Sequence, residues 1–192
     1  MLKVVAEDPG DFYQHYPRAA AVVTVTSEGR KNAMAVAWHC PVSFKPPFYG
    51  IAVSPKRFTY NMILQSKHFA INFLPFEKIE LIAALGGSSG SFTDKFTEFN
   101  LLEDQPVKTD VPILRDAYAS YECAVIENRI FGDHAWITGQ ILATHVAEDL
   151  LKDNGVPDLE LVRPALYLGG DIYCSTDAGT VKHLDREKFG RG

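Results

Sequence analysis

The chain has 192 residues, a length that fits one domain, residues 1–192, with a single sizeable core. The 19 lysines and arginines against 24 aspartates and glutamates give a net charge of −5, and no basic cluster is denser than Lys56 with Arg57, which argues against phosphate-driven nucleic-acid binding. No apolar run approaches the roughly 18 residues that span a bilayer, and acidic and turn residues interrupt the N-terminal region, so we expect a soluble, cytoplasmic protein without a membrane partner.

The first part of the chain predicts three strands and a helix. Ala19–Ser27 is rich in small and β-branched residues, and with the turn SEGR and the alternating segment NAMAVAW (Asn32–Trp38) it predicts a β-hairpin. The prolines of the following PVSFKPP exclude a central strand there, and an extended pattern resumes over Phe48–Ser54. Thr59 is placed to cap a helix that ends near Lys67.

The remaining elements are again mostly strands. His68–Leu74 predicts a strand, and Glu77–Leu85 has the spacing of a short helix that the next two glycines stop before a polar loop. Ala117–Ile130 and Ala135–Val146 predict two long strands, and Ala165–Tyr173 a last short one. Many strands with two short helices indicate a mostly β fold, an antiparallel barrel and not a doubly wound sheet.

The segment SPKRFTYN (Ser54–Asn61) is the candidate phosphate site, because neither GxGxxG nor GxxxxGK[ST] is present. A strand here runs into Pro55, two cations, a hydroxyl and a helix start, so Arg57, Thr59 and free helix amides can converge on one dianion, with Asn61 adding an amide. The alternative is a solvated basic turn before an ordinary capped helix.

A second motif points to hydrolysis. Gly86, Ser88 and Gly90 spell GxSxG, and Asp110 and His134 follow in the order of that class. The nucleophile elbow needs a strand before the serine and a helix after it, whereas here a predicted helix precedes and a polar loop follows. A serine hydrolase using Ser88 is therefore a remote alternative.

Other candidate groups have both a functional and a structural interpretation. His134, in FGDH between two predicted strands, either orients a bound ring and supplies a proton or simply fixes a turn. Several aromatic residues either stack on a planar heterocycle or fill the barrel core: Trp38, Phe48, Tyr49, Tyr60, Phe73 and Tyr173.

The cysteines and histidines give no sign of a metal or of disulfides. Cys40, Cys123 and Cys174 are odd in number and widely separated, so we expect reduced thiols. The six histidines are scattered, and the neighbours His39 and Cys40 would point to opposite faces of a strand. We predict no metal site.

The motifs taken in order are more specific than any one of them. NAMAVAW with CPVSFKPP, then SPKRFTYNMI, SSGSFTDKF, FGDH followed by TGQI, and LYLGGDIY together resemble the flavin reductase-like family, which includes flavoredoxin and the small reductase components of two-component monooxygenases. The resemblance extends from about Tyr16 to Tyr173. It implies a homodimer of antiparallel, Greek-key-like split β-barrels with FMN near the subunit interface.

The resemblance also implies a binding role for each motif. The phosphate would lie at Arg57, Thr59 and Asn61, and His134 would face the nicotinamide. Backbone amides would donate to the flavin ring from two strands, whose residues are Met34, Ala35, Val36, Ala37, Trp38, His39 and Cys40 in one and Ala52, Val53 and Ser54 in the other. Three loop residues would close over the flavin: Ser89, Asp94 and Lys95.

The expected reaction is hydride transfer from NADH or NADPH to N5 of FMN, followed by electron transfer to an acceptor or a partner monooxygenase. Family members often carry Arg where this chain has Ser91, which leaves the choice between NADH and NADPH open. The other hypothesis is a flavin-binding electron carrier without its own NAD(P)H activity, because the same contacts would hold FMN in either protein.

Overall fold

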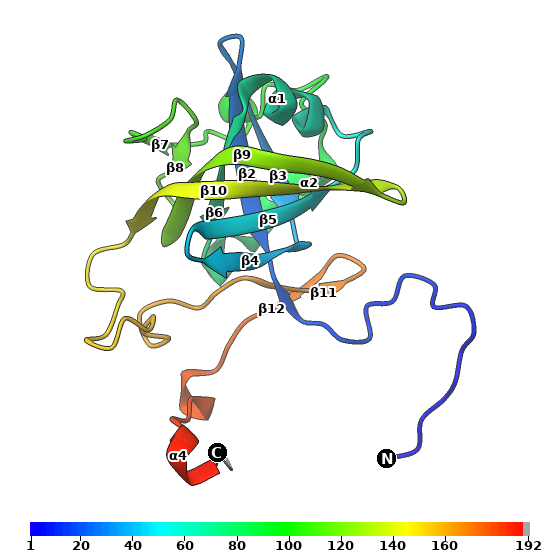
Figure 1. Cartoon of the computed structure of the whole chain (residues 1–192), viewed down its shortest axis with the longest axis vertical. Coiled ribbons are helices and arrows are strands. Elements are labelled where there is room, and N and C mark those ends of the chain that lie inside the picture. The colour runs from blue at the N-terminus through cyan, green and yellow to red at the C-terminus, as the bar shows by residue number, and fades with distance from the viewer. Residues whose placement is uncertain (190–192) are drawn as a thin grey trace.

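In the computed structural model, which describes residues 1–189, a seven-stranded antiparallel sheet forms the main body (Figure 1). The strand order is β3-β2-β6-β9-β10-β5-β4, and every neighbouring pair is antiparallel. The strands are β2 (Ala21–Ser27), β3 (Arg30–Val36), β4 (His39–Phe44), β5 (Pro47–Val53), β6 (His68–Phe73), β9 (Ala119–Phe131) and β10 (His134–Val146). The prediction of a mostly β, antiparallel fold with short helices is confirmed.

Shorter elements cover the sheet and its ends. In Figure 1, α1 lies at one end of the sheet and the small sheet of β11 and β12 at the other, where both chain termini also lie. The strands outside the seven-stranded sheet are β1 (Arg18–Ala19), β7 (Glu103–Asp104), β8 (Ile113–Leu114), β11 (Leu166–Gly169) and β12 (Ile172–Cys174). The helices are α1 (Phe58–Ser66), α2 (Ile79–Gly87), α3 (Lys95–Glu98) and α4 (Arg186–Phe189), with 3-10 turns η1 (Phe76–Lys78) and η2 (Ala178–Thr180).

The core lies on both faces of β2. Because successive side chains of a strand point to opposite faces, Val23 and Val25 pack in a cluster with α1, while Val22 packs with α2. Both faces are therefore buried, which explains the almost continuous apolar run of this strand. The two clusters fix α1 and α2 on either side of the β2–β3 hairpin, and thereby the loops that follow Val53 and Gly87.

The prolines after Trp38 act as the sequence predicts. His39–Phe44 forms the edge strand β4, whose register with β5 shifts between Pro41 and Ser43. An edge strand tolerates a missing amide donor, whereas a central strand does not.

Two predictions of local structure were wrong. The N-cap of α1 is Arg57, without a side-chain hydrogen bond, and Thr59 lies inside the helix with only 2% of its surface exposed. Its hydroxyl is drawn inward because it accepts a hydrogen bond from the buried Asn32 of β3 at 2.9 Å. The polar loop after α2 also contains α3, whose cap Asp94 accepts from the amides of Phe96 and Thr97.

Candidate functional site

A groove runs along β3 and consists of three adjoining cavities of about 140, 520 and 180 Å³. Ala35 and Arg57 line all three cavities, so the groove is continuous from the start of α1 to the end of β3. The middle cavity falls within the range of small-molecule sites, about 300–1,000 Å³. It is lined by β3 on one side and by Tyr167 and Tyr173 of the small sheet on another.

The first end of the groove, which we call the phosphate end, is built for an anion. Its described lining residues include three cations and three hydroxyl groups but no carboxylate: Lys56, Arg57, Lys95, Thr59, Ser88 and Ser89. The first turn of α1 adds backbone N–H groups that have no acceptor within the helix. Charge, the Thr59 hydroxyl and helix amides therefore fit a phosphate dianion.

Lys95 is the buried cation of this end. Only 2% of it is exposed, and its Nζ donates to the carbonyls of Ala33 at 2.9 Å and Leu85 at 2.7 Å. An ammonium has three hydrogens, so one remains for a ligand in the cavity that Lys95 lines. Burial, and then the charge of Arg57, lower the pKa of Lys95 to about 8. An anion beside Lys95 would therefore offset the unfavourable free energy of burying its ammonium charge.

Asn32 and Gly90 determine the local packing at the phosphate end. The Asn32 amide donates to the Thr59 hydroxyl, which keeps that hydroxyl hydrogen available for the groove. A Cβ at Gly90 would overlap Asn32 and Phe58, so only glycine lets the loop approach this closely, and Arg30 donates to the Gly90 carbonyl. The other amide atom, Asn32 Oδ1, is buried without a partner among the described residues.

The opposite end, which we call the ring end, is lined mainly by backbone and small or aromatic side chains. Residues of β3, β5 and their flanks form one side, and those described are Met34, Ala35, Val36, Ala37, Trp38, Ala52, Val53 and Ser54. The expectation that Ala52 donates to a ligand needs correction, because its N–H already donates to the Trp38 carbonyl at 2.8 Å. This bond ties β5 to the chain just after β3.

His134 reaches the ring end from the start of β10. Its ring centroid lies 4.8 Å from that of Trp38, and its Nδ1 is 2.8 Å from the Asp133 carboxylate. A carboxylate only accepts, so Nδ1 carries a hydrogen and Nε2 is left for the cavity. This hydrogen bond also lowers the pKa of Asp133.

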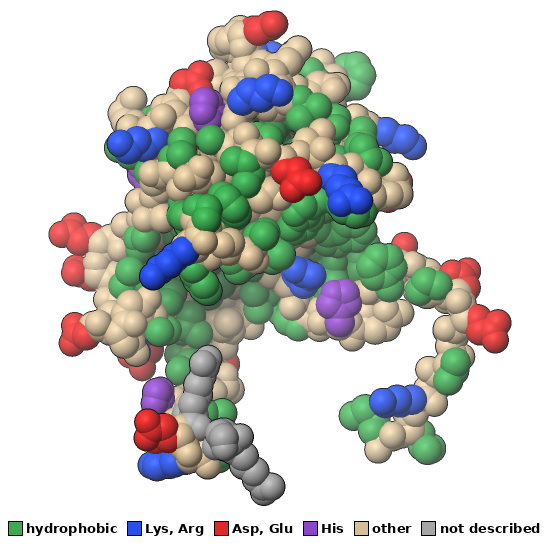
Figure 2. Space-filling model, viewed as in Figure 1, with side chains coloured by type: hydrophobic (Ala, Val, Ile, Leu, Met, Phe, Trp, Pro, Cys, Tyr) green, Lys and Arg blue, Asp and Glu red, His purple; other side chains and the backbone are tan. Residues whose placement is uncertain are grey.

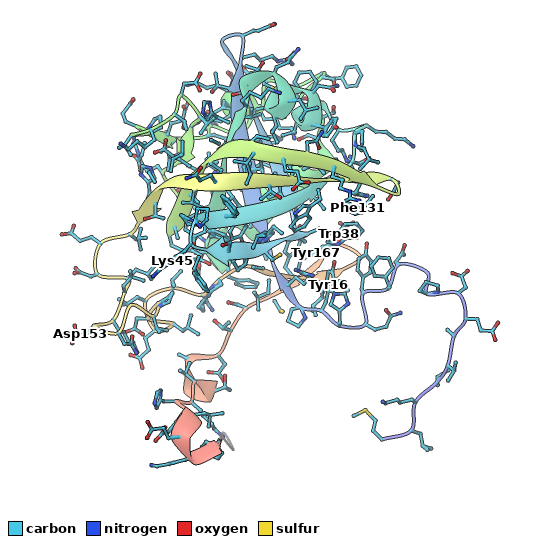
Figure 3. The ribbon with its side chains drawn as sticks, in the orientation of Figure 1. Tyr16, Trp38, Lys45, Phe131, Asp153 and Tyr167 are labelled. Carbon is cyan, nitrogen blue, oxygen red and sulfur yellow. The ribbon has the colours of Figure 1, made fainter. Side chains whose placement is uncertain are left out.

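Sequence reasoning missed three tyrosines of the ring end. Tyr13 and Tyr16 come from the N-terminal segment and Tyr167 from β11, and all three line the cavity. Figure 3 shows Tyr16, Trp38 and Tyr167 close together. Nothing in the local pattern around them marks a site, because their convergence depends on how the small sheet packs.

Several predicted site residues lie outside the groove lining. Asn61 is exposed on α1, and Asp94 serves as the cap of α3. His39 is buried between the Tyr49 hydroxyl and the Ala19 carbonyl, 2.7 and 2.9 Å away, and Cys40 follows it in β4. The remaining candidates line the groove, among them Arg57, Thr59, Ser89 and Lys95.

The serine hydrolase alternative is unsupported. Ser88 follows α2, and its hydroxyl donates to the Ala84 carbonyl at 2.7 Å. His134, the histidine of that hypothetical triad, pairs with Asp133 and lies at the ring end, whereas Ser88 lines the phosphate end. The geometry that a triad requires is missing from the described residues.

Residues 1–189 also bear on two further classes of site. No group of three or more His, Cys, Asp or Glu side chains there is arranged to hold a metal ion. None of the helices in this range is both long and apolar enough to cross a membrane.

A model of the flavin reductase like domain matches residues 13–175, and the chain therefore belongs to the flavin reductase-like family. An FMN-binding protein from Thermus thermophilus, solved with bound 1-cyclohex-2-enone, is 34% identical, with a TM-score of 0.84 over 95% of this chain and 100% of that one. A relative from Aeropyrum pernix is longer, and the match spans 58% of its length.

Two relatives of lower sequence identity are also similar to this chain. A putative flavin reductase with a split barrel domain from Shewanella frigidimarina is 18% identical, with a TM-score of 0.82 over 90% of this chain and 88% of that one, which confirms the predicted split barrel. The reductase component of an FADH(2)-dependent resorcinol hydroxylase from Rhizobium is 24% identical over 86% of this chain and 85% of its own length.

Proposed function

We propose that the chain is an NAD(P)H-dependent flavin reductase that holds FMN in the groove along β3. One observation carries the proposal: a carboxylate-free pocket with Lys56, Arg57 and Lys95 at one end of a groove whose other end is lined by backbone, aromatic rings and His134. FMN has the same two parts, because a flexible chain joins its phosphate to its flat ring. The phosphate fits the charged end of the groove, and the ring fits the other end. Family membership and the FMN-binding Thermus relative support the choice of cofactor.

Each group of residues has a separate task. Arg57 and Lys95 bind the phosphate through charge-assisted hydrogen bonds, and the Thr59 hydroxyl, directed by Asn32, adds a donor. The β3 and β5 backbone orients the ring, while Trp38 excludes water from it. FMN itself, when bound, supplies the hydride and electron chemistry. His134, held by Asp133, is positioned to contact the nicotinamide and to hold or move a proton at Nε2.

The assembly and the partners belong to the same proposal. We infer a homodimer, because Ile126, Ile130 and Phe131 near the end of β9 are about half exposed, and Figure 2 shows hydrophobic side chains between polar ones on the face that carries β9 and β10. A monooxygenase that consumes reduced flavin is a fitting partner, since one relative is a reductase component. We propose one domain over residues 1–192, of which 190–192 lie outside the described range, and a cytoplasmic location.

The second candidate is an electron carrier that binds FMN but does not react with NAD(P)H. The phosphate end is compatible with either function, because it serves only binding. The two candidates differ at the ring end, where only a reductase needs space for the nicotinamide beside His134.

An anaerobic titration separates these candidates. Purified protein is loaded with FMN, and the flavin absorbance is followed after NADH or NADPH is added. We expect bleaching by at least one of the two, and a slower reduction in His134→Asn with unchanged FMN affinity. His183→Asn, an exposed histidine of the C-terminal segment, is the matched control and should behave as the parent. FMN binding without reduction by either nucleotide would leave the carrier, and absence of FMN binding would exclude both.

A further inference from the structure

We propose that residues 12–16 complete the ring end as a subsite for a small, uncharged planar compound, whose carbonyl oxygen accepts a hydrogen bond from the Tyr16 hydroxyl. The inference rests on the proposed function and names the class of electron acceptor that the function leaves open.

The N-terminal segment is docked on the ring end by specific contacts. The Phe12 ring stacks on Trp38, with centroids 5.9 Å apart and planes at 27°, and Tyr13 meets Tyr167 edge-on at 6.3 Å. Tyr13 also fits against Gly169, where φ is +98° and a Cβ would overlap the Tyr13 ring. Glycine is required there both for its backbone conformation and for this close approach. The segment is thus part of the cavity wall, although residues 1–10 extend away from the body (Figure 1).

The walls of the cavity select a flat molecule. Five rings line it, those of Tyr13, Tyr16, Trp38, His134 and Tyr167. Aromatic walls favour planar ligands, which stack or pack edge-on against them. Tyr16 packs between its neighbours at defined angles, 60° to Tyr13 and 63° to Tyr167, so the rings form a fixed surface.

The Tyr16 hydroxyl supplies the polar anchor. The indole N–H of Trp38 donates to its oxygen at 2.7 Å, which fixes the position of the oxygen and leaves the hydroxyl hydrogen free. Within residues 1–189 no side chain or carbonyl accepts that hydrogen. A ligand oxygen would therefore accept the second hydrogen bond of the Tyr16 hydroxyl. Because donation from Trp38 polarises the phenol, the hydrogen bond from Tyr16 to that oxygen is strengthened.

The charges of the lining residues also limit which ligands the subsite can bind. None of the described lining residues carries a carboxylate, so no side chain of the cavity wall can form an ion pair with a cationic ligand. Arg57, its one permanent cation, also lines the phosphate end, where an FMN phosphate would take its charge. An uncharged aromatic or conjugated carbonyl compound fits the remaining surface.

Binding of benzaldehyde to the oxidised, FMN-loaded protein tests the subsite, with the change in flavin absorbance as the readout. We expect saturable binding to the parent protein and about tenfold weaker binding to Tyr16→Phe, which removes one hydrogen bond and keeps the ring. Tyr13→Phe, the matched change in the same wall, should stay within about twofold. Toluene, which has the ring but no carbonyl, should bind more weakly than benzaldehyde and should not distinguish Tyr16→Phe from the parent.

The outcomes separate the subsite from the proposed function. Equal affinity of the parent and Tyr16→Phe for benzaldehyde, equal effects on toluene, or no saturable binding to the FMN-loaded parent would overturn the subsite. A Tyr16→Phe effect confined to the KM for NAD(P)H would assign the hydroxyl to the nicotinamide instead. Failure of the parent to bind FMN would overturn the proposed function, and the subsite with it.

Discussion

The two ends of the groove are lined by different kinds of groups. The phosphate end has charged and hydroxyl side chains from the turn before α1, from α1 and α3 and from the loop after α2, whereas the ring end has residues of β3 and β5 and aromatic rings. A dianion needs concentrated charge, which only side chains and helix amides supply, while a flat ring with several polar atoms is matched by regularly spaced backbone groups. Substitutions at the two ends should therefore separate FMN from riboflavin, which lacks the phosphate.

Lys95→Met is expected to have the largest effect. It removes the buried cation, so FMN should bind about 100-fold more weakly, while riboflavin affinity should change little. Fluorescence titration with both flavins measures the difference. Because the Ala33 and Leu85 carbonyls lose their donor, the melting temperature should be measured in parallel. A similar loss for both flavins would mean that Lys95 supports the fold and not the phosphate.

Arg57→Ala should weaken FMN about 30-fold, or by about 2 kcal/mol, because an exposed guanidinium contributes less than a buried ammonium. Lys67→Ala, an exposed cation at the other end of α1, is the matched control and should leave both flavins unaffected. Unchanged FMN affinity in Arg57→Ala would show that the phosphate lies elsewhere.

The pH dependence of FMN affinity follows from the lowered pKa of Lys95, about 8. The ammonium form binds the phosphate, so affinity is highest below this pKa and falls as the pH rises through it, by up to about tenfold per pH unit. Below pH of about 6 affinity should fall again, because the phosphate gains a proton. Isothermal titration across this range measures both limbs. Riboflavin should show neither, and an identical profile for the two flavins would contradict the assignment.

Trp38→Phe should have the smallest effect, about 1 kcal/mol, and should weaken FMN and riboflavin equally. The change keeps an aromatic wall but removes the N–H that donates to Tyr16. Equilibrium titration with both flavins is the measurement. A loss of affinity for FMN but not for riboflavin would show that Trp38 affects phosphate binding, and would contradict separate roles for the two ends.

Several residues predicted from the sequence line this groove because some of its parts are local. Arg57 and Thr59 are two residues apart at a strand-to-helix junction, and Met34–Trp38 is one strand end, so their spacing alone brings them together. Thr59 lines the cavity but is not the cap of α1, because its hydroxyl bonds to the buried Asn32 amide, which lies 27 residues away in the sequence. Capping rules describe a helix and its flanks, and they contain no information about such a neighbour.

Other predicted residues do not line the groove. Asp94 was expected to close over the flavin, yet it caps α3, and Asn61 lies on the exposed side of α1. The burial of His39 between Tyr49 and Ala19 likewise depends on the neighbouring strand and on β1. Side-chain direction at these positions is set by packing, which a motif does not specify.

The long strands, the β2–β3 hairpin, the exclusion of a central strand at the prolines and the strand-to-helix turn at Arg57 follow from the sequence, because alternation, prolines and turn residues act over a few residues. The strand β4 itself was not predicted. Two other contacts could not be read from the sequence: Lys95 donates to the Ala33 carbonyl across 62 residues, and Trp38 donates to Tyr16. These contacts depend on how separate elements pack, and the groove exists only where those elements meet.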